Sequence, residues 1–287
     1  MVSYTALYNP YSNCGEGEKC AHRLDAMALD GNVQYVDITK IEDYSELFYK
    51  LYEENSSLIV CGGDGTLNRF INATKEITFR NPVYYFACGT GNDFLRDINH
   101  EQGEKPIDIT EYIKNLPVVR VNGCEYHFLN NVGFGIDGYC TQVGDEMRAV
   151  GKKNINYAGI AIKGLLGGFH PVDATINVDG LTHYYQNVWL APTMKGRYYG
   201  GGMMPTPNQN RDSTDKRVSV MVYHAKDKLK ALMVFPSIFQ GEHIKHEKMV
   251  DIIQGHDIHV SFDRPCPLQV DGETILGVTD YQVHTGR

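Results

Sequence analysis

The chain of 287 residues has no surplus of positive charge. Its 27 Lys and Arg against 35 Asp and Glu give a net charge of −8 at pH 7. Broad nucleic-acid binding needs a basic stripe that neutralises phosphates, so we expect no nucleic-acid partner. No apolar run reaches the roughly 18 residues of a transmembrane helix, and the first residues lack the basic and apolar regions of a secretory signal. We therefore expect a cytoplasmic protein without a transmembrane segment.

The chain also lacks cysteine pairs at metal-binding spacing. Its seven cysteines are odd in number and scattered, and none forms a C-x-x-C pair. This pattern is typical of reduced, mostly buried thiols in an intracellular protein and disfavours a structural zinc.

The two halves of the chain differ in their hydrophobic pattern. Up to about Pro117, strand-like and helix-like segments alternate, which predicts an α/β domain with a parallel sheet. Beyond it, strands joined by Asn, Gly, Asp and Pro turns predict a β-rich domain, a sandwich, over residues 118–279. In the first domain we expect strands at Val2–Tyr8, Val33–Ile38, Leu58–Cys61 and Val83–Ala87, and helices at Lys19–Leu29, Tyr44–Glu54 and Leu67–Lys75. In the second domain we expect strands at Val118–Val121, Glu125–Asn130, Ala174–Val178, Gln186–Ala191, Val218–Tyr223, Asp257–Phe262 and Leu268–Val270. We also expect helical insertions at Asn154–Gly167 and Leu229–Phe239.

A glycine-rich turn follows the buried strand Leu58–Cys61. It reads Gly62-Gly63-Asp64-Gly65-Thr66-Leu67-Asn68 and leads into a helix. Glycines let backbone N–H groups approach an anion, and a helix N-terminus adds partial positive charge. Asp64 would repel a phosphate unless it holds Mg²⁺ or accepts a proton. The simpler interpretation is a tight turn with a capping Asp.

A second turn of the same kind follows the strand Val83–Ala87. It reads Cys88-Gly89-Thr90-Gly91-Asn92-Asp93. Two such turns after neighbouring parallel strands would meet at the carboxyl edge of the sheet, where ligands bind in open α/β folds. By itself the second turn could be an ordinary loop with Asn92 or Asp93 as a cap. The chain contains neither a Walker A sequence nor an H-R-D kinase loop.

At these residues the sequence resembles the diacylglycerol kinase catalytic-domain family, which is similar to sphingosine and ceramide kinases and more distantly to NAD kinases. Seven segments in order carry the resemblance, and they span most of the chain. With the family pattern in parentheses, they are Asn9–Gly15 (N-P-x-S-G-x-G, with Asn13 here at the first Gly), Gly62–Asn68 (G-G-D-G-T-L-N), Gly89–Arg96 (G-T-x-N-D-F-x-R), Pro106–Ile109 (V-D-I-G), Phe128–Gly135 (F-x-N-x-x-G-x-G), Gly241–His246 (G-E-H-x-K-H) and Val270–Glu273 (V-D-G-E).

The resemblance implies an ATP- and Mg²⁺-dependent lipid kinase. Its N-terminal domain would be NAD-kinase-like α/β and its C-terminal domain a β-sandwich, with residues 280–287 returning to the first domain. The lipid would be met at a membrane surface, on the inner face, and a homodimer is left open. The resemblance implies Asp64, Asp108 and Glu273 as catalytic, with either Glu273 or Asp64 as the base. It implies Asp64, Asp93 and Asp108 near the metal, and Asn9, Ser12, Gly62, Gly63, Gly65, Thr66, Asn68, Gly89, Thr90, Gly91 and Asn92 at the nucleotide.

Some segments depart from the family pattern or invite other interpretations. Arg69 stands where the family often has Glu, and residues 207–215 lack the family's D-D-G, so a structural Mg²⁺ site near Asp212 and Asp215 is left open. Gly133–Gly138 spells G-x-G-x-x-G, a weak dinucleotide signal. The histidines of Gly241–His246 lack typical metal spacing.

Two other functions compete with the lipid kinase. One is an NAD-kinase-like kinase of a soluble substrate, against which the missing Asn-Glu dipeptide and the V-D-G-E ending count. The other is a non-catalytic nucleotide or lipid sensor. For the apolar segments Ile155–Phe169 and Leu229–Phe239 two interpretations stay open, packing in a core or contact with a bilayer. The positive charges of Lys152, Lys153 and Lys163 favour a bilayer with anionic lipids.

Overall fold

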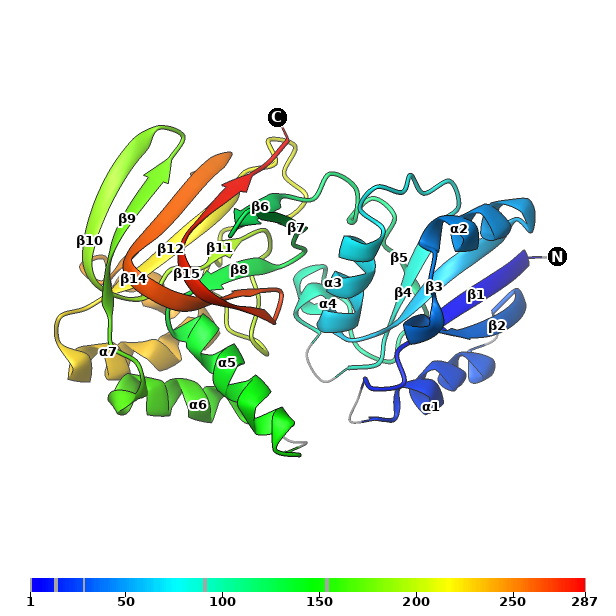
Figure 1. Ribbon diagram of the computed structural model, residues 1–287, viewed down its shortest axis with the longest axis horizontal. Helices are drawn as coiled ribbons and strands as arrows, with labels where there is room; N and C mark the ends of the chain where they lie inside the picture. The colour runs from blue at the N-terminus through cyan, green and yellow to red at the C-terminus, as the bar shows by residue number, and fades with distance from the viewer. Residues whose placement is uncertain (1, 13–14, 28, 90–91, 153–154, 287) are drawn as a thin grey trace. The chain divides into compact units, whose positions relative to one another are not determined.

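The computed structural model describes residues 2–12, 15–27, 29–89, 92–152 and 155–286 (Figure 1). Contacts divide the chain into two compact units, Met1–Asn115 and Leu116–Arg287. The division lies two residues before Pro117, where the sequence pattern changes.

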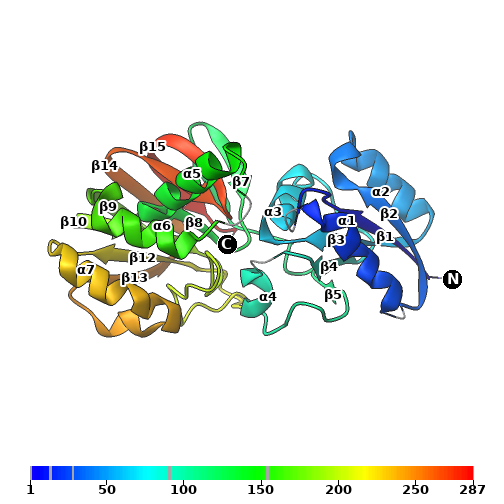
Figure 2. The ribbon, with the colours of Figure 1, turned by 90° about the horizontal axis from the view of Figure 1, so that it is seen from below.

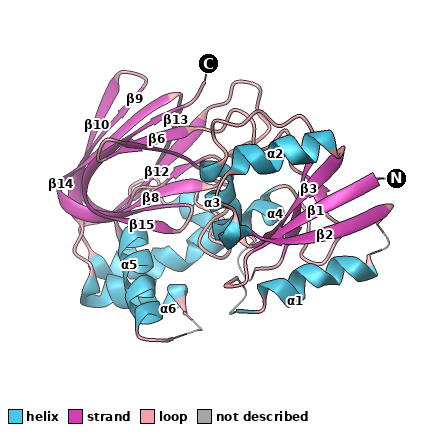
Figure 3. Ribbon diagram, turned by 45° about the vertical axis from the view of Figure 1, so that its right-hand side comes forward, coloured by secondary structure: helices cyan, strands magenta, loops and turns pink. Residues whose placement is uncertain are grey.

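Unit 1 is built on a five-stranded sheet with the order β2-β1-β3-β4-β5. The first four strands are parallel, and β5 runs antiparallel to β4. Helix α1 and helix α2 lie on opposite faces of this sheet (Figure 3). The elements are β1 (Val2–Tyr8), α1 (Gly17–Ala21), η2 (His22–Ala26), β2 (Gly31–Asp37), η3 (Ile38–Lys40), α2 (Tyr44–Glu53), β3 (Ser56–Gly62), α3 (Asp64–Ala73), β4 (Val83–Ala87), α4 (Asp93–Asp97) and β5 (Ile107–Asp108).

The apolar residues Leu58–Cys61 of strand β3 are buried because helices cover both faces of the sheet. Ile59 and Cys61 pack in the core with Leu24 and Cys20 of the α1–η2 segment. Their neighbours in the strand point to the opposite face, since side chains alternate. Asp43 starts α2 by accepting hydrogen bonds from two backbone N–H groups of the first turn.

Unit 2 is built on a ten-stranded sheet with α-helices and short helical turns beside it (Figure 1). Its elements are β6 (Val118–Val121), β7 (Cys124–His127), β8 (Asn131–Phe134), α5 (Ile136–Ala149), α6 (Tyr157–Lys163), η4 (Gly164–Gly168), β9 (Val172–Val178), β10 (Leu181–Leu190), β11 (Thr193–Met194), β12 (Val218–His224), α7 (Lys228–Val234), η5 (Phe235–Gln240), η6 (Glu242–Lys245), β13 (Val250–Gly255), β14 (Asp257–Val270) and β15 (Glu273–His284).

The long strand β14 closes this sheet on itself. Residues 258–262 of β14 pair with β9, and residues 268–270 pair with β8. The path β8-β11-β12-β10-β9 returns to β14, so the strands form a ring around a shared core. The predicted class, an α/β domain followed by a β-rich domain, is confirmed.

Three details of the second half differ from the sequence-based expectation. Residues 280–284 do not join the first sheet: they belong to β15, which pairs with β14 and β6 inside unit 2. The two expected strands Asp257–Phe262 and Leu268–Val270 are one strand. The expected strand Glu125–Asn130 ends at His127, and β8 begins at Asn131.

Helix α5, which begins at Ile136 inside the G-x-G-x-x-G segment Gly133–Gly138, was not expected from the sequence. Two glycines inside α5 lower its helix propensity, but packing requires them. A Cβ on Gly138 would lie 1.8 Å from the Pro267 carbonyl oxygen, and one on Gly144 would lie 2.8 Å from the Tyr157 ring. Gly138 and Gly144 therefore allow the close packing of α5.

Candidate active site

The first glycine turn lies where β3 ends and α3 begins. Gly62 must be glycine because a Cβ there would lie 2.4 Å from Cβ of Thr66. Gly65 is exposed, and a Cβ on it would meet nothing within 4 Å. The first turn of α3 therefore presents an open surface at a helix N-terminus, which carries partial positive charge.

The second glycine turn is tied to the first by Asp64. Its Oδ2 atom accepts a hydrogen bond of 2.9 Å from the backbone N–H of Asp93, the first residue of α4. The backbone N–H of Cys88 also donates to the Gly62 carbonyl at 2.7 Å. The two turns therefore lie together at the carboxyl edge of the parallel sheet, as the strand order predicts.

The end of β1 contributes a third segment to this edge. Asn9 Nδ2 donates to Thr66 Oγ1 at 3.4 Å, and Asn9 Oδ1 accepts from the backbone N–H of Tyr11. Ser12 Oγ donates to the Asn9 carbonyl at 2.8 Å, so this hydroxyl stabilises its own turn. Gly17 packs against that carbonyl with no room for a Cβ.

Buried polar groups line the floor of this edge. The hydroxyl of Tyr85 donates to the Gly62 carbonyl at 3.0 Å, and burial, with the charge of Asp64 second, raises the pKa of Tyr85 well above its ordinary value. Asn92 Nδ2 donates to the Gly89 carbonyl at 2.8 Å. Asn92 Oδ1 is buried and has no hydrogen-bond partner in the described part of the chain.

Asp64 and Asp93 are joined through the Asp93 backbone, but among the described residues they form no metal-binding group of three with Asp108. Asp93 is buried, whereas Asp108 is exposed on β5 and accepts hydrogen bonds from Thr110 N and Oγ1 at 2.8 and 2.6 Å. Within the described residues, no group of three or more His, Cys, Asp or Glu side chains is arranged to hold a metal ion. Thr90 and Gly91 lie outside the described residues, and Asn68 is buried in α3.

A second set of candidate residues lies in unit 2, at the turn between β14 and β15. Asp271 Oδ2 accepts from the backbone N–H of Leu129 at 2.6 Å, and Oδ1 accepts from those of Asn130 and Asn131 at 2.9 and 2.8 Å. The resemblance matched both of these segments, and the structure places them in contact. Glu273, half-buried, follows two residues later at the start of β15.

Sequence reasoning missed the basic side chains beside this turn. Arg211, which is 8% exposed, donates to the Leu129 carbonyl at 2.6 Å and to Asn130 Oδ1 at 2.9 Å. Burial, and secondly the charge of Arg211, lower the pKa of Lys195. Lys195 belongs to no matched segment, and Arg211 lies in residues 207–215, where the family pattern is incomplete. The sequence does not show that these residues lie beside the Asp271 turn.

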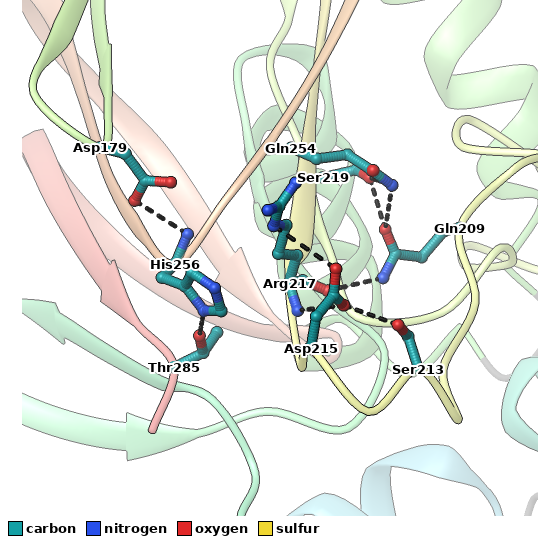
Figure 4. A network of polar contacts seen from close by, with 9 residues as sticks. All are labelled: Asp179, Gln209, Ser213, Asp215, Arg217, Ser219, Gln254, His256 and Thr285. Atoms are coloured by element: carbon teal, nitrogen blue, oxygen red, sulfur yellow. Dashed lines mark hydrogen bonds and ion pairs between the residues drawn. The ribbon is translucent and has the colours of Figure 1, made fainter. Parts of the chain in front are cut away.

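Asp215, near which a structural Mg²⁺ site was left open, is bonded to other protein groups (Figure 4). Asp215 accepts from Ser213 Oγ at 2.6 Å, and its other oxygen lies 3.4 Å from Arg217 Nε. Asp212 is exposed. The cluster of polar contacts around Asp215 consists of hydrogen bonds and ion pairs between protein groups.

The Gly241–His246 segment has a structural role. His243 is fully buried, and its Nε2 atom is hydrogen-bonded to the Pro205 carbonyl at 2.8 Å. Burial lowers the pKa of His243, which keeps the ring neutral. Gly241 has a φ of +70°, the left-handed conformation that ends η5.

Comparison with known proteins places this architecture in a family. Residues 3–124 match the diacylglycerol kinase catalytic domain, and residues 130–283 match the YegS C-terminal NAD kinase beta sandwich-like domain. The two matches together cover most of the chain. The protein therefore belongs to the diacylglycerol kinase catalytic-domain family with a YegS-type C-terminal domain.

Individual relatives are similar over nearly the whole chain. A diacylglycerol kinase of Mycobacterium tuberculosis is 25% identical over 285 residues, covering 93% of this chain and 90% of that protein. A crystal structure from Bacillus anthracis str. Sterne has a TM-score of 0.65 at 20% identity and covers 100% of this chain and 92% of that one. A diacylglycerol kinase structure from the same strain has a TM-score of 0.59 at 18% identity, over 99% and 94% of the two chains. These structures support the fold.

Proposed function

We propose that this protein is an ATP-dependent lipid kinase that phosphorylates a hydroxyl group of diacylglycerol or a similar lipid. Family membership supports the reaction class. The observation that carries the proposal is the hydrogen bond from the Asp93 backbone to Asp64, which joins two glycine turns at one edge of the sheet. Phosphoryl transfer depends mainly on positioning and charge neutralisation, which such an edge can provide.

The nucleotide would bind over the first glycine turn. Gly65 leaves the N-terminus of α3 open, and Thr66 and Asn9 present hydroxyl and amide groups beside it. Asn92 adds a buried acceptor oxygen at the second turn. Helix N-termini favour phosphates because their N–H groups carry partial positive charge.

The residues present fit Mg²⁺ through a single carboxylate. Mg²⁺ in kinases is commonly held by one or two carboxylates together with substrate phosphates and water, so a ready-made cluster of three is unnecessary. Asp64 is the carboxylate at the turn itself, and we assign it to the metal. When bound, the ion would neutralise the charge of the phosphates. Asp108 takes no direct part in this proposal, since it is exposed and bonded to Thr110.

Glu273 is the better candidate for the general base. One oxygen of Asp64 already accepts a hydrogen bond from the Asp93 N–H, and we assign this carboxylate to the metal, which leaves Glu273 for the base. Glu273 follows the turn that contains Asp271, whose carboxylate accepts hydrogen bonds from three backbone N–H groups. These bonds fix the position of the backbone at Glu273. A base needs this kind of positioning to reach a lipid hydroxyl.

A radiolabelled-ATP assay against a panel of lipids tests the proposal. We expect label in a diacylglycerol or related lipid, dependence on Mg²⁺, and no labelled product from NAD or sphingoid bases added as competitors. Label in NAD would identify the soluble-substrate kinase instead. ATP or lipid binding without any labelled product would identify a sensor.

A further inference from the structure

One face of unit 2 is formed by two neighbouring helical segments. Helix α6 continues into η4, and α7 lies beside them in two views (Figures 1 and 2). The Lys228 ammonium group donates a hydrogen bond to the Leu166 carbonyl and links the two segments. The two segments therefore share one continuous surface.

This surface carries four exposed apolar side chains, which we call the apolar ridge. Ile162 and Leu166 are 44% and 57% exposed, and Leu229 and Met233 are 70% and 72% exposed. Each pair is spaced four residues apart, so each lies on one side of its helix. The opposite side of α7 is already buried in the core through Ala231 and Val234. The core therefore does not account for the outward apolar residues of α7.

Lysines border the ridge, and we call them the lysine rim. A hollow beside the start of α7 is lined by Lys226, Lys230, Lys245 and Lys248. The hollow has two acidic residues, and one of them, Asp227, accepts hydrogen bonds from the first turn of α7. Lys163 lies at the end of α6. Lys245 forms an ion pair with Glu242 at 2.7 Å, and the rim still has more lysines than carboxylates in a chain whose net charge is −8.

We propose that this face docks on an anionic lipid bilayer. The apolar ridge inserts at the boundary between headgroups and acyl chains, and the lysine rim pairs with lipid phosphates. This inference rests on the proposed function in one respect, because an enzyme that phosphorylates a lipid has to reach its substrate at a membrane. A second copy of this chain fits the face less well, because a symmetric interface would bring two lysine rims together.

Co-sedimentation with vesicles tests the docking without catalysis. The vesicles contain phosphatidylcholine alone or with phosphatidylglycerol, and neither substrate lipid nor ATP is present. We expect binding to the anionic vesicles that weakens at high salt, since exposed charges are screened. Leu229→Glu should weaken that binding about tenfold or more by placing a charge at the apolar boundary. Lys226→Glu with Lys230→Glu should weaken it about tenfold as well.

Matched controls separate the face from general effects of charge. Leu181→Glu makes the same substitution at a leucine that is also 70% exposed but lies in β10. Lys75→Glu with Lys105→Glu reverses two exposed lysines of unit 1. Both controls should bind like the wild type, and all variants should keep the wild-type melting temperature because the changed side chains are exposed.

Three results would overturn the docking proposal. They are no binding to anionic vesicles by the wild type, an equal loss in Leu181→Glu, and a dimer in light scattering that Leu229→Glu dissociates. Activity toward a short-chain diacylglycerol in detergent micelles is measured separately. Vesicle binding without that activity would contradict the proposed function alone, and activity without vesicle binding would contradict the docking alone.

Discussion

Asp64 Oδ2 accepts a hydrogen bond of 2.9 Å from the backbone N–H of Asp93, a residue 29 positions further along the chain. The two residues open the successive helices α3 and α4, each of which follows a strand of the parallel sheet. One carboxylate thereby fixes the spacing between two glycine turns. Mutation can separate the effect of the negative charge of Asp64 from its effect as a hydrogen-bond acceptor.

Asp64→Asn should abolish most activity with little effect on folding. The amide oxygen can still accept from the Asp93 N–H, but the negative charge is lost. We expect turnover to fall about a hundredfold or more, and the free energy of unfolding to change by less than about 1 kcal/mol. Initial rates with labelled ATP and urea denaturation measure the two effects. Asp30→Asn, at an exposed position of unit 1, serves as control; wild-type turnover in Asp64→Asn would refute the assigned role.

Gly62→Ala and Gly65→Ala should have opposite effects although they lie in the same turn. A Cβ on Gly62 would lie 2.4 Å from Cβ of Thr66, so we expect a loss of about 1–3 kcal/mol in the free energy of unfolding. Gly65→Ala has open space and gains helix propensity, so stability should stay level or rise by up to about 1 kcal/mol. It should raise the KM for ATP if the nucleotide lies over this turn. Equal stability of both variants would contradict the packing argument.

Asp271→Asn and Glu273→Gln should separate a structural from a catalytic carboxylate. Asn has one acceptor oxygen and turns an NH₂ group toward a backbone N–H, so Asp271→Asn should lower the free energy of unfolding by about 2–3 kcal/mol. Glu273→Gln should leave the melting temperature unchanged and reduce turnover about a hundredfold or more. Denaturation and initial rates distinguish the two. A stable, fully active Glu273→Gln would remove the proposed base.

Asp137 should make the stability of unit 2 depend on pH. Burial raises its pKa from 3.8 to about 8, and Tyr199 donates a hydrogen bond of 2.5 Å to its Oδ1 atom. Between these values the folded state holds a proton that the unfolded chain has lost. The free energy of unfolding should therefore fall as pH rises from about 4 to about 8, by up to about 1.4 kcal/mol per pH unit.

Asp137→Asn should flatten this dependence because the amide does not titrate. Urea denaturation at several pH values in that window measures it, with Asp212→Asn at an exposed position as control. Parallel curves for the wild type and Asp137→Asn would show that the carboxyl is charged in the folded protein.

Local sequence signals predicted much of the first unit and less of the second. Strands β1, β3 and β4 were anticipated because apolar runs ending in glycine or Asn-Pro turns mark buried parallel strands. Helix α5 was missed because Gly138 and Gly144 argue against a helix unless Pro267 and Tyr157 are known to pack there. The resemblance implied that residues 280–287 return to the first unit, whereas residues 280–284 pair with β14 and β6 of unit 2.

The candidate residues show the same division. The amino-acid order alone determined the two glycine turns, the V-D-G-E ending and the absence of a basic surplus, because these depend on residue types at short spacing. Tertiary structure decided that Asp64 bonds to Asp93, that Asp271 holds three backbone N–H groups, that Asp108 is exposed and that Arg211 is buried. The physical reason is that hydrogen bonding and burial join segments up to 142 residues apart, and no local pattern records which distant groups will meet.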